Sequence, residues 1–273
     1  MIVIKIGGAA GVNLEAVCRD VAELAGQGQP VLLAHGGSAE TNEISTQLGH
    51  PPKMVTAVSG FTSRYTDRAT LEIFAMVTCG KINTLLVERL QQAGVNAFGL
   101  SGVDGRLMVA RRKDAIRILE NGRQRILRDD FTGKIEAVDG DLLRMLLGAG
   151  YTPVIAPLAV SPEGVALNVD ADRAAAALAG AVQADELVIL TNVPGLMRSF
   201  PDESTLIDHV SYARLEQALA HAEGRMKKKV LGASEALALG VGRVTFADGR
   251  IERPVFSALA GKGTVITMEG AHA

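Results

Sequence analysis

The chain opens with Met1-Ile2-Val3-Ile4-Lys5-Ile6-Gly7-Gly8-Ala9-Ala10-Gly11, a segment that indicates an α/β fold. Residues 2–6 form a short, β-branched, apolar run that is typical of a buried strand, and glycines follow it directly. Asn13 then predicts the N-cap of a helix that runs to about residue 25. A strand, a glycine-rich turn and a helix are the first half of a βαβ unit.

The same order recurs along the chain. A strand predicted at residues 31–34 ends at Gly36 and Gly37, and a helix follows from Ser38. Further strands are expected at 96–100, 153–156, 159–161, 165–167, 186–191, 243–246 and 264–267, and helices at 67–93 (broken by Gly80), 139–147, 170–180 and from Ser211 and Gly224. This pattern predicts an α/β fold, a three-layer α/β/α sandwich with a mainly parallel open sheet. Such sheets bind ligands beyond the carboxyl ends of their strands.

We expect residues 1–273 to form a single domain with two lobes, because α/β folds of this length often do so. The first lobe spans about residues 1–180 and the second about 181–273. Residues 106–134 differ from their surroundings, since short alternating segments flank Asn121-Gly122, a strong hairpin turn signal. A β-hairpin inserted in the first lobe is therefore predicted.

Composition excludes several classes of function. A net charge of −2 and a pI near 6.2 give the whole chain no electrostatic reason to bind nucleic acid or an anionic membrane. The chain opens without a basic leader, and no apolar run approaches the ~20 residues of a membrane span, so we expect a cytoplasmic protein. Cys18 and Cys79 lie in apolar helical patterns that indicate buried, reduced thiols. The histidines lack metal-ligand spacing, so no protein-held metal is expected.

The first motif that carries chemistry is Lys5 followed by Gly7 and Gly8. A lysine in an apolar strand needs an anionic partner, and glycine lets backbone N–H groups approach an anion. A phosphate-binding turn is therefore favoured over a solvent-facing lysine, although tight strand-to-helix turns also need glycine. The turn matches neither a Walker A pattern nor a complete dinucleotide fingerprint, which disfavours a P-loop NTPase and a Rossmann dehydrogenase.

Three further motifs lie at predicted strand ends. His35-Gly36-Gly37-Ser38 places glycines before a helix N-terminus, a position that suits a carboxylate or a phosphoryl group, and His35 itself is interpreted as structural or supporting. Asn168-Val169-Asp170-Ala171-Asp172 holds two aspartates, of which N-capping explains one and organisation of cations the other. The loop from Thr191 to Leu196 is followed by a helix that opens with Lys227-Lys228-Lys229. Lysines there oppose the helix dipole, so an anion is expected in front of them.

These elements, in this order and over essentially the whole chain, resemble the amino acid kinase family and its acetylglutamate kinase group. The resemblance implies a phosphotransferase that uses ATP to phosphorylate the side-chain carboxylate of an N-blocked acidic amino acid, with Mg²⁺ held mainly by phosphates and water. It implies that Lys5 and Lys229 stabilise the transferring phosphoryl group and that Asp172 orients them. The implied substrate-binding residues are Gly36, Gly37, Ser38, Arg64 and Asn168, and the implied ATP-binding residues are Gly7, Gly8, Thr191, Asn192, Val193, Gly195, Leu196, Met226 and Lys227.

Details of these motifs resemble one branch of that group. Ser38 stands where a third glycine is usual, Asp170 stands where asparagine is usual, and Thr66-Asp67-Arg68 follows the arginine motif. The branch phosphorylates α-aminoadipate carried on the small acidic protein LysW, in lysine biosynthesis. The alternative with the same chemistry is N-acetylglutamate kinase of arginine biosynthesis, or dual use. The alternative from another class is a non-catalytic amino-acid or nucleotide sensor, which would be expected to lack one of the two lysines or the aspartate.

Local charge predicts a carrier-binding surface. Residues 106–134 contain nine basic and four acidic residues, a surplus of five positive charges in a chain of net charge −2. We expect Arg111, Arg112 and Lys113 to dock an acidic carrier, while the alternative is an exposed hairpin that simply tolerates charge.

The chain begins directly with its first strand, without the N-terminal helix that links dimers into hexamers in arginine-inhibited acetylglutamate kinases. A homodimer is therefore expected.

Overall fold

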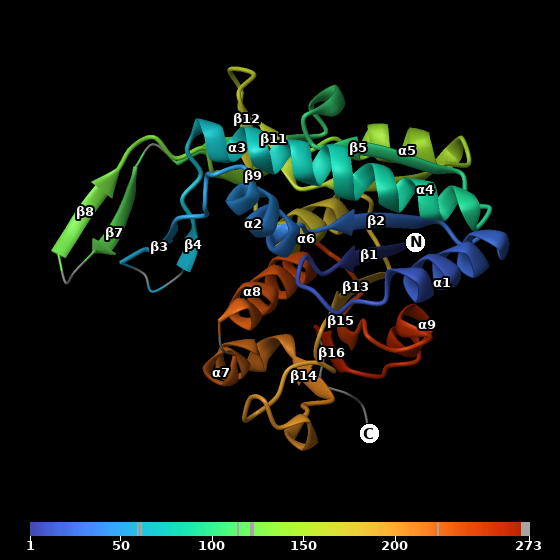
Figure 1. Ribbon diagram of the computed structural model, residues 1–273. Coiled ribbons are helices and arrows are strands. Elements are labelled where there is room, and N and C mark those ends of the chain that lie inside the picture. The colour runs from blue at the N-terminus through green and yellow to red at the C-terminus, as the bar shows by residue number, and fades with distance from the viewer. Residues whose placement is uncertain (59, 61, 114, 121–122, 223, 269–273) are drawn as a thin grey trace.

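The structure is a computed structural model that describes residues 1–58, 60, 62–113, 115–120, 123–222 and 224–268. An eight-stranded sheet forms its centre, in the order β14-β16-β15-β13-β1-β2-β10-β5 (Figure 1). These strands are β1 (Ile2–Ile6), β2 (Val31–His35), β5 (Ala97–Ser101), β10 (Thr152–Ala156), β13 (Glu186–Thr191), β14 (His209–Ser211), β15 (Arg243–Asp248) and β16 (Thr264–Thr267). Neighbours pair in parallel except β15 and β16, which are antiparallel. The predicted mainly parallel sheet is confirmed.

Helices cover both faces of this sheet, because its strands are apolar on both sides. Ile2, Ile4 and Ile6 of β1 pack in one apolar cluster with α1, α4 (Thr84–Gln92) and α9, whereas Val3 packs in another with α5, α6 and α8. The helices are α1 (Leu14–Gly26), α2 (Ser38–Gln47), α5 (Gly140–Gly148), α6 (Ala171–Ala181), α7 (Leu215–His221), α8 (Arg225–Ala238) and α9 (Pro254–Leu259), with short 3₁₀ turns η2 (Asp104–Arg106), η3 (Glu203–Thr205) and η4 (Tyr212–Arg214). The three-layer sandwich is thus confirmed.

One long helix departs from the prediction. It consists of α3 (Arg68–Ala75), a π-helical segment η1 (Met76–Asn83) and α4 (Thr84–Gln92), and Gly80 lies inside η1 without breaking it. A glycine costs a helix about 1 kcal/mol relative to alanine, which the packing of apolar residues on both sides outweighs. Buried residues of α3 and α4, such as Leu71 and Leu90, hold the continuous helix against the core.

The same helix corrects the expectation that no apolar segment is long enough to span a membrane. Among the described residues, Arg68–Gln92 has a mean hydropathy of 1.4 over its most apolar window and would be long and apolar enough to cross a membrane, by length and composition alone. The core helix of a soluble protein passes the same test, and 44% of that window is buried inside this structure.

A second sheet and an arm complete the molecule. The sheet has the order β12 (Ala166–Asn168), β11 (Leu158–Val160), β6 (Met108–Arg112) and β9 (Gly133–Val138), and the arm comprises two antiparallel pairs, β3 (Met54–Thr56) with β4 (Thr62–Arg64) and β7 (Ile116–Glu120) with β8 (Arg123–Leu127). Figure 1 shows the arm projecting from the body. The Val58 amide donates to the Arg117 carbonyl oxygen, 3.0 Å away, and so joins the two pairs. A hairpin lies within the predicted residues 106–134, but it consists of β7 and β8 alone, because β6 and β9 belong to the second sheet. Its Asn121-Gly122 turn lies outside the described residues.

Other element predictions need correction. Strands β3, β4, β9 and β14 and helix α9 were not predicted, since they are short or lack a clear period. The helix expected from Ser211 begins later, at Leu215, because Ser211 ends a strand and a 3₁₀ turn intervenes. Cys18 is buried as expected, but Cys79 is only half-buried.

Candidate active site

An open cavity of about 1480 Å³ lies at the carboxyl ends of β1, β2 and β13. Strands that run in parallel present their ends, and the helix N-termini that follow, at one edge of the sheet. The cavity is lined by every residue that the sequence assigned to catalysis, substrate or ATP: Lys5, Gly7, Gly8, Gly36, Gly37, Ser38, Arg64, Asn168, Asp172, Thr191, Asn192, Val193, Gly195, Leu196, Met226, Lys227 and Lys229.

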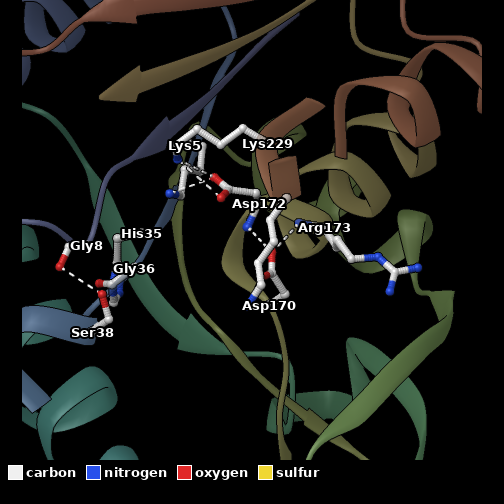
Figure 2. Close-up of polar contacts among 10 residues, drawn as sticks. Lys5, Gly8, His35, Gly36, Ser38, Asp170, Asp172, Arg173 and Lys229 are labelled. Atoms are coloured by element: carbon white, nitrogen blue, oxygen red, sulfur yellow. Dashed lines mark hydrogen bonds and ion pairs between the residues drawn. The ribbon is translucent and has the colours of Figure 1, made fainter. Parts of the chain in front are cut away.

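A buried ion cluster lies at the centre of this cavity. The Nζ atom of Lys5 is 2.8 Å from Asp172 Oδ1, and the Nζ atom of Lys229 is 3.1 and 3.2 Å from Asp172 Oδ1 and Oδ2 (Figure 2). Lys5 is 3% exposed, and Lys229 and Asp172 are each 8% exposed. One carboxylate therefore holds two ammonium groups, which leaves the cluster with a net positive charge.

Electrostatics keep this cluster charged. Burial alone would raise the pKa of Asp172, but the positive charges of Lys229 and Lys5 outweigh it and hold that pKa well below its usual range. Burial lowers the pKa of Lys229 to about 8, with Asp172 opposing this shift and Lys5 adding to it. At neutral pH the cluster suits an anion, since a buried excess of positive charge attracts a phosphate or a carboxylate.

Two glycine turns pack against each other beside the cluster. A Cβ atom on Gly8 would overlap the Gly37 nitrogen, and one on Gly36 would lie 2.8 Å from the Gly8 nitrogen. The Ala39 amide donates to the Gly8 carbonyl oxygen at 3.0 Å, which ties the turns together. Glycine is required at these positions by the close approach of backbone to backbone, so the Gly-rich pattern has a packing cause as well as a binding one.

His35 lies beneath the second glycine turn, as the supporting role predicted for it requires. Its Nδ1 atom is 2.9 Å from the Gly36 carbonyl oxygen and its Nε2 atom is 3.0 Å from Asn83 Nδ2. Burial lowers the pKa of His35 to about 4, with a further contribution from the charge of Lys5. The imidazole is therefore neutral in the physiological range and acts within the protein scaffold.

The two aspartates at the start of α6 divide their roles. Asp170 is the N-cap, because its Oδ1 accepts hydrogen bonds from the amides of Asp172 and Arg173 at 3.0 and 3.2 Å (Figure 2). Asp172 turns instead to the lysines. Lys228, which the sequence did not assign to the site, lies 4.0 Å from Asp170 Oδ2. The capping and the cation-organising interpretations thus each account for one carboxylate.

One end of the cavity is formed by α2, β4 and β12. Arg64 Nη2 donates to the Ser38 carbonyl oxygen at 3.2 Å, and Asn168 Nδ2 donates to Thr66 Oγ1 at 3.1 Å. Asn42 also lines this end, and its buried Oδ1 accepts no hydrogen bond from the part of the chain that the structure describes. Sequence reasoning did not assign Asn42 to the site, although its place one turn after Ser38 was a usable signal.

The second end of the cavity is formed by the loop after β13 and the start of α8. Leu196 N donates to Thr264 Oγ1 at 2.8 Å, and Gly195 packs so closely on Thr264 that a Cβ atom there would lie 2.6 Å from its hydroxyl. Met197 and Phe200 line this end as well and were not predicted. Apolar and glycine-rich walls of this kind suit a planar base with phosphates at the lysine end.

Two of the three residues expected to dock an acidic carrier, Arg111 and Arg112, make contacts within the protein. Arg111 and Arg112 belong to β6 and not to the hairpin, since β6 ends at Arg112. Arg111 Nε donates to Glu136 Oε1 at 2.6 Å, while the Arg112 guanidinium stacks 3.9 Å above the Phe131 ring. Lys113 lines the cavity. Within the described residues, no group of three or more histidine, cysteine, aspartate or glutamate side chains is arranged to hold a metal.

The fold and this site define a kinase class, and the chain belongs to the amino acid kinase family, whose model matches residues 1–248. The chain is 57% identical to a [LysW]-aminoadipate kinase of Deinococcus radiodurans over 98% of this chain and 91% of that protein. It is 53% identical to a [LysW]-aminoadipate kinase of Thermus thermophilus over 97% and 100%. An acetylglutamate kinase of Methanopyrus kandleri is 36% identical over 97% and 100%.

Solved structures agree on the fold. N-acetylglutamate synthase from Neisseria gonorrhoeae matches with a TM-score of 0.80 and 26% identity, over 98% of this chain and 59% of that chain. A carbamate kinase from Giardia matches with a TM-score of 0.69 and 17% identity over 98% of each chain, a likeness that concerns the fold alone. The expected family and fold class are therefore confirmed.

Proposed function

We propose that this protein is an ATP-dependent kinase that phosphorylates the side-chain carboxylate of α-aminoadipate carried on LysW, in lysine biosynthesis. The observation that carries the chemistry is the pair of buried lysines on one aspartate, 2.8 and 3.1 Å from Asp172 Oδ1, at the strand ends. The similarity to [LysW]-aminoadipate kinases over nearly the whole chain supports the substrate.

The ion cluster suits transfer of a phosphoryl group to a carboxylate. A carboxylate is ionised at neutral pH, so it attacks the γ-phosphorus without a general base. The new bond joins the carboxylate oxygen to phosphorus while the bond from the γ-phosphorus to the bridging oxygen breaks, which gives an acyl phosphate and ADP. Lys5 and Lys229 offset the negative charge of the transferring group, and Asp172 holds the two ammonium groups together.

The carboxylates of this site fit an Mg²⁺ ion only if the ion is bound by the phosphates of the nucleotide. Asp172 is already paired with both lysines, and Asp170 caps α6, so neither carboxylate offers a dedicated metal ligand. We propose that the phosphates and water hold the ion, which neutralises phosphate charge when bound. The protein then contributes cations and amide groups around it.

We propose that the first lobe, about residues 1–180, binds the acidic substrate and that the second, about 181–273, binds ATP. The fork of Arg64 suits the α-carboxylate, with Asn168 beside it, and the amides of Gly36, Gly37 and Ser38 suit the side-chain carboxylate and the phosphoryl group that it accepts. Gly7 and Gly8 face the phosphates. The remaining nucleotide contacts are proposed for Thr191, Asn192, Val193, Gly195, Leu196, Met226 and Lys227, all of which line the cavity.

The substrate is tested by steady-state ADP release with four acceptors: LysW-linked aminoadipate, LysW-linked glutamate, N-acetylglutamate and N-acetylaminoadipate. We expect the largest kcat/KM for LysW-linked aminoadipate. The alternative of N-acetylglutamate kinase or dual use is supported by the 36% identical acetylglutamate kinase, and a larger kcat/KM for N-acetylglutamate would establish it. Absence of turnover with every acceptor would favour the sensor.

We further propose that Arg111, Arg112 and Lys113 dock the acidic carrier. The local surplus of positive charge supports this, and Lys113 links the surface to the cavity. Because Arg112 stacks on Phe131, its reversal would also disturb packing. The cleaner variant reverses Arg111 and Lys113 to glutamate, with the exposed Lys262→Glu as the matched control. The double variant should raise the KM for the carrier-linked substrate, and wild-type KM should rise with salt. If the KM for the carrier-linked substrate does not depend on salt and is unchanged by the reversal, these residues do not dock the carrier.

We also propose a homodimer that acts in the cytoplasm. Three large apolar side chains on the long helix and the edge strand β5 are exposed by 57%, 44% and 41%, namely Met76, Leu85 and Phe98. A second copy of the chain that covers this face would bury them and the open edge of β5. Light scattering should give twice the chain mass for the wild type and the single mass for Leu85→Glu with Phe98→Glu. A hexamer would contradict the proposal.

A further inference from the structure

A buried hydrogen-bond network links the π-helical segment η1 to the glycine turn after β2. Asn83, the last residue of η1, is 5% exposed, and its Nδ2 atom lies 3.0 Å from His35 Nε2 and 2.9 Å from the Val154 carbonyl oxygen. His35 Nδ1 lies 2.9 Å from the Gly36 carbonyl oxygen. The network therefore runs from the helix, through the imidazole, to the peptide that joins Gly36 and Gly37. π-helical turns often occur at functional sites.

These contacts determine which nitrogen of His35 carries the proton. A carbonyl oxygen only accepts, so the Asn83 group that faces Val154 must be the NH₂ and not the amide oxygen. The second hydrogen of that NH₂ points to Nε2, which must then be unprotonated. The proton lies on Nδ1 and is donated to the Gly36 carbonyl oxygen. Burial lowers the pKa of His35 to about 4, so this neutral form persists at physiological pH.

The held carbonyl group controls a neighbouring donor. The Gly36 carbonyl and the Gly37 N–H belong to one trans peptide, because the cis bond found in the described chain is Phe200-Pro201. In a trans peptide these groups point in opposite directions. Holding the carbonyl toward His35 turns the Gly37 N–H away from it, toward Gly8 and the cavity. Gly37 is also the N-cap of α2, where a helix leaves amides without intrahelical partners.

We propose that Asn83 is a positioning residue that acts through the Nδ1–H tautomer of His35 and aims the Gly37 N–H at the transferring phosphoryl group. In this role Asn83 does not touch the substrate. A Cβ atom on Gly99 would overlap Asn83 Oδ1, so the neighbouring strand is shaped to hold the amide in this orientation. The inference rests on the kinase activity proposed above, but it does not depend on which acidic substrate is used.

The first test measures the tautomer directly. Long-range ¹H–¹⁵N NMR of the full chain labelled with ¹⁵N-histidine distinguishes a protonated Nδ1 from a protonated Nε2, and His35→Gln assigns the signal among the five histidines. We expect a protonated Nδ1 and an unprotonated Nε2 for His35 from pH 6 to 8. A protonated Nε2 overturns the proposal. This measurement needs no substrate, so it stands even if the proposed function fails.

The second test separates positioning from stability. Asn83→Leu keeps the size of the side chain but loses both donors, and Thr245→Val is the control, because it removes a buried hydrogen bond to Glu186 at the opposite end of the sheet. With the best acceptor found above, Asn83→Leu should lower kcat by about tenfold or more and leave both KM values within about twofold, since the lost alignment acts in the transition state.

The control should match the loss in Tm and keep wild-type kcat. Equal kcat in Asn83→Leu and wild type would overturn the proposal, as would an equal loss of kcat in the control. If Asn83→Leu does not fold, the NMR result on the wild-type chain still decides whether His35 has the tautomer that the proposal requires.

Discussion

The ion cluster and the arm border the same cavity but are built in opposite ways. Lys5, Asp172 and Lys229 are at most 8% exposed and lie on elements held by the two large apolar clusters of the body. The arm has a small cluster of its own around Ile118, and it projects from the body (Figure 1). Phosphoryl transfer requires fixed geometry, whereas an element that meets a large substrate gains from opening at low free-energy cost.

Removal of a lysine is the change with the largest expected effect. Lys5→Ala and Lys229→Ala should each lower kcat by at least ~10²-fold, because a buried donor to the developing charge is lost. Stopped or continuous ADP assays measure this, and circular dichroism checks the fold. Wild-type turnover in either variant would remove the cluster from the chemistry.

Arg64→Lys tests the boundary between body and arm, since Arg64 ends β4. A compact ammonium cannot replace the bidentate fork on a carboxylate, so the KM of the acidic substrate should rise by about tenfold or more, with kcat and the KM of ATP little changed. Initial rates at varied concentrations of each substrate provide the measurement. An unchanged KM for the acidic substrate would show that Arg64 does not bind it.

The pH profile tests the charge of the cluster. The pKa of Lys229 is lowered from 10.5 to about 8, so its ammonium form is present below that pH and lost above it. We expect kcat/KM for ATP to fall about tenfold per pH unit above pH 8, while the limb for kcat lies higher because bound phosphate favours the ammonium. The unfolded state binds more protons between pH 8 and 10.5, so this group makes stability rise with pH there. A flat profile to pH 9.5 would contradict the assignment.

The smallest effects are expected when one apolar side chain is removed, either from the small cluster of the arm or from the core of the body. Ile118→Ala removes a side chain that is 2% exposed from the arm, and Leu187→Ala removes one that is fully buried from the body. Each deletion costs about 2–5 kcal/mol of local packing. Ile118→Ala should raise the KM of the acidic substrate a few-fold and speed hydrogen exchange in β7 with little change in Tm. Leu187→Ala should lower Tm and leave KM unchanged. Equal Tm losses would show that the arm and the body unfold together.

Most strands of the central sheet, most of its covering helices and the four chemical motifs could be predicted from the sequence, whereas β14 and α9 could not. Apolar β-branched runs such as residues 2–6 form buried strands. Asn13, Gly37 and Asp170 mark where helices begin. These signals are local, because propensity, capping and turn chemistry act over a few residues. The glycine-rich strand ends also pointed to an anion site before any contact was known.

Which residues meet could be seen only from the folded chain. The Lys229 and Asp172 side chains come together from two helices, and Lys5 reaches them from β1, so no sequence spacing could show that one carboxylate holds both cations. The same holds for Asn83 and His35, and for the strands β3 and β4 of the arm, which are too short to have a clear period. Long-range pairing depends on how whole faces pack, and packing sums contributions from residues far apart in the chain, which a local pattern does not contain.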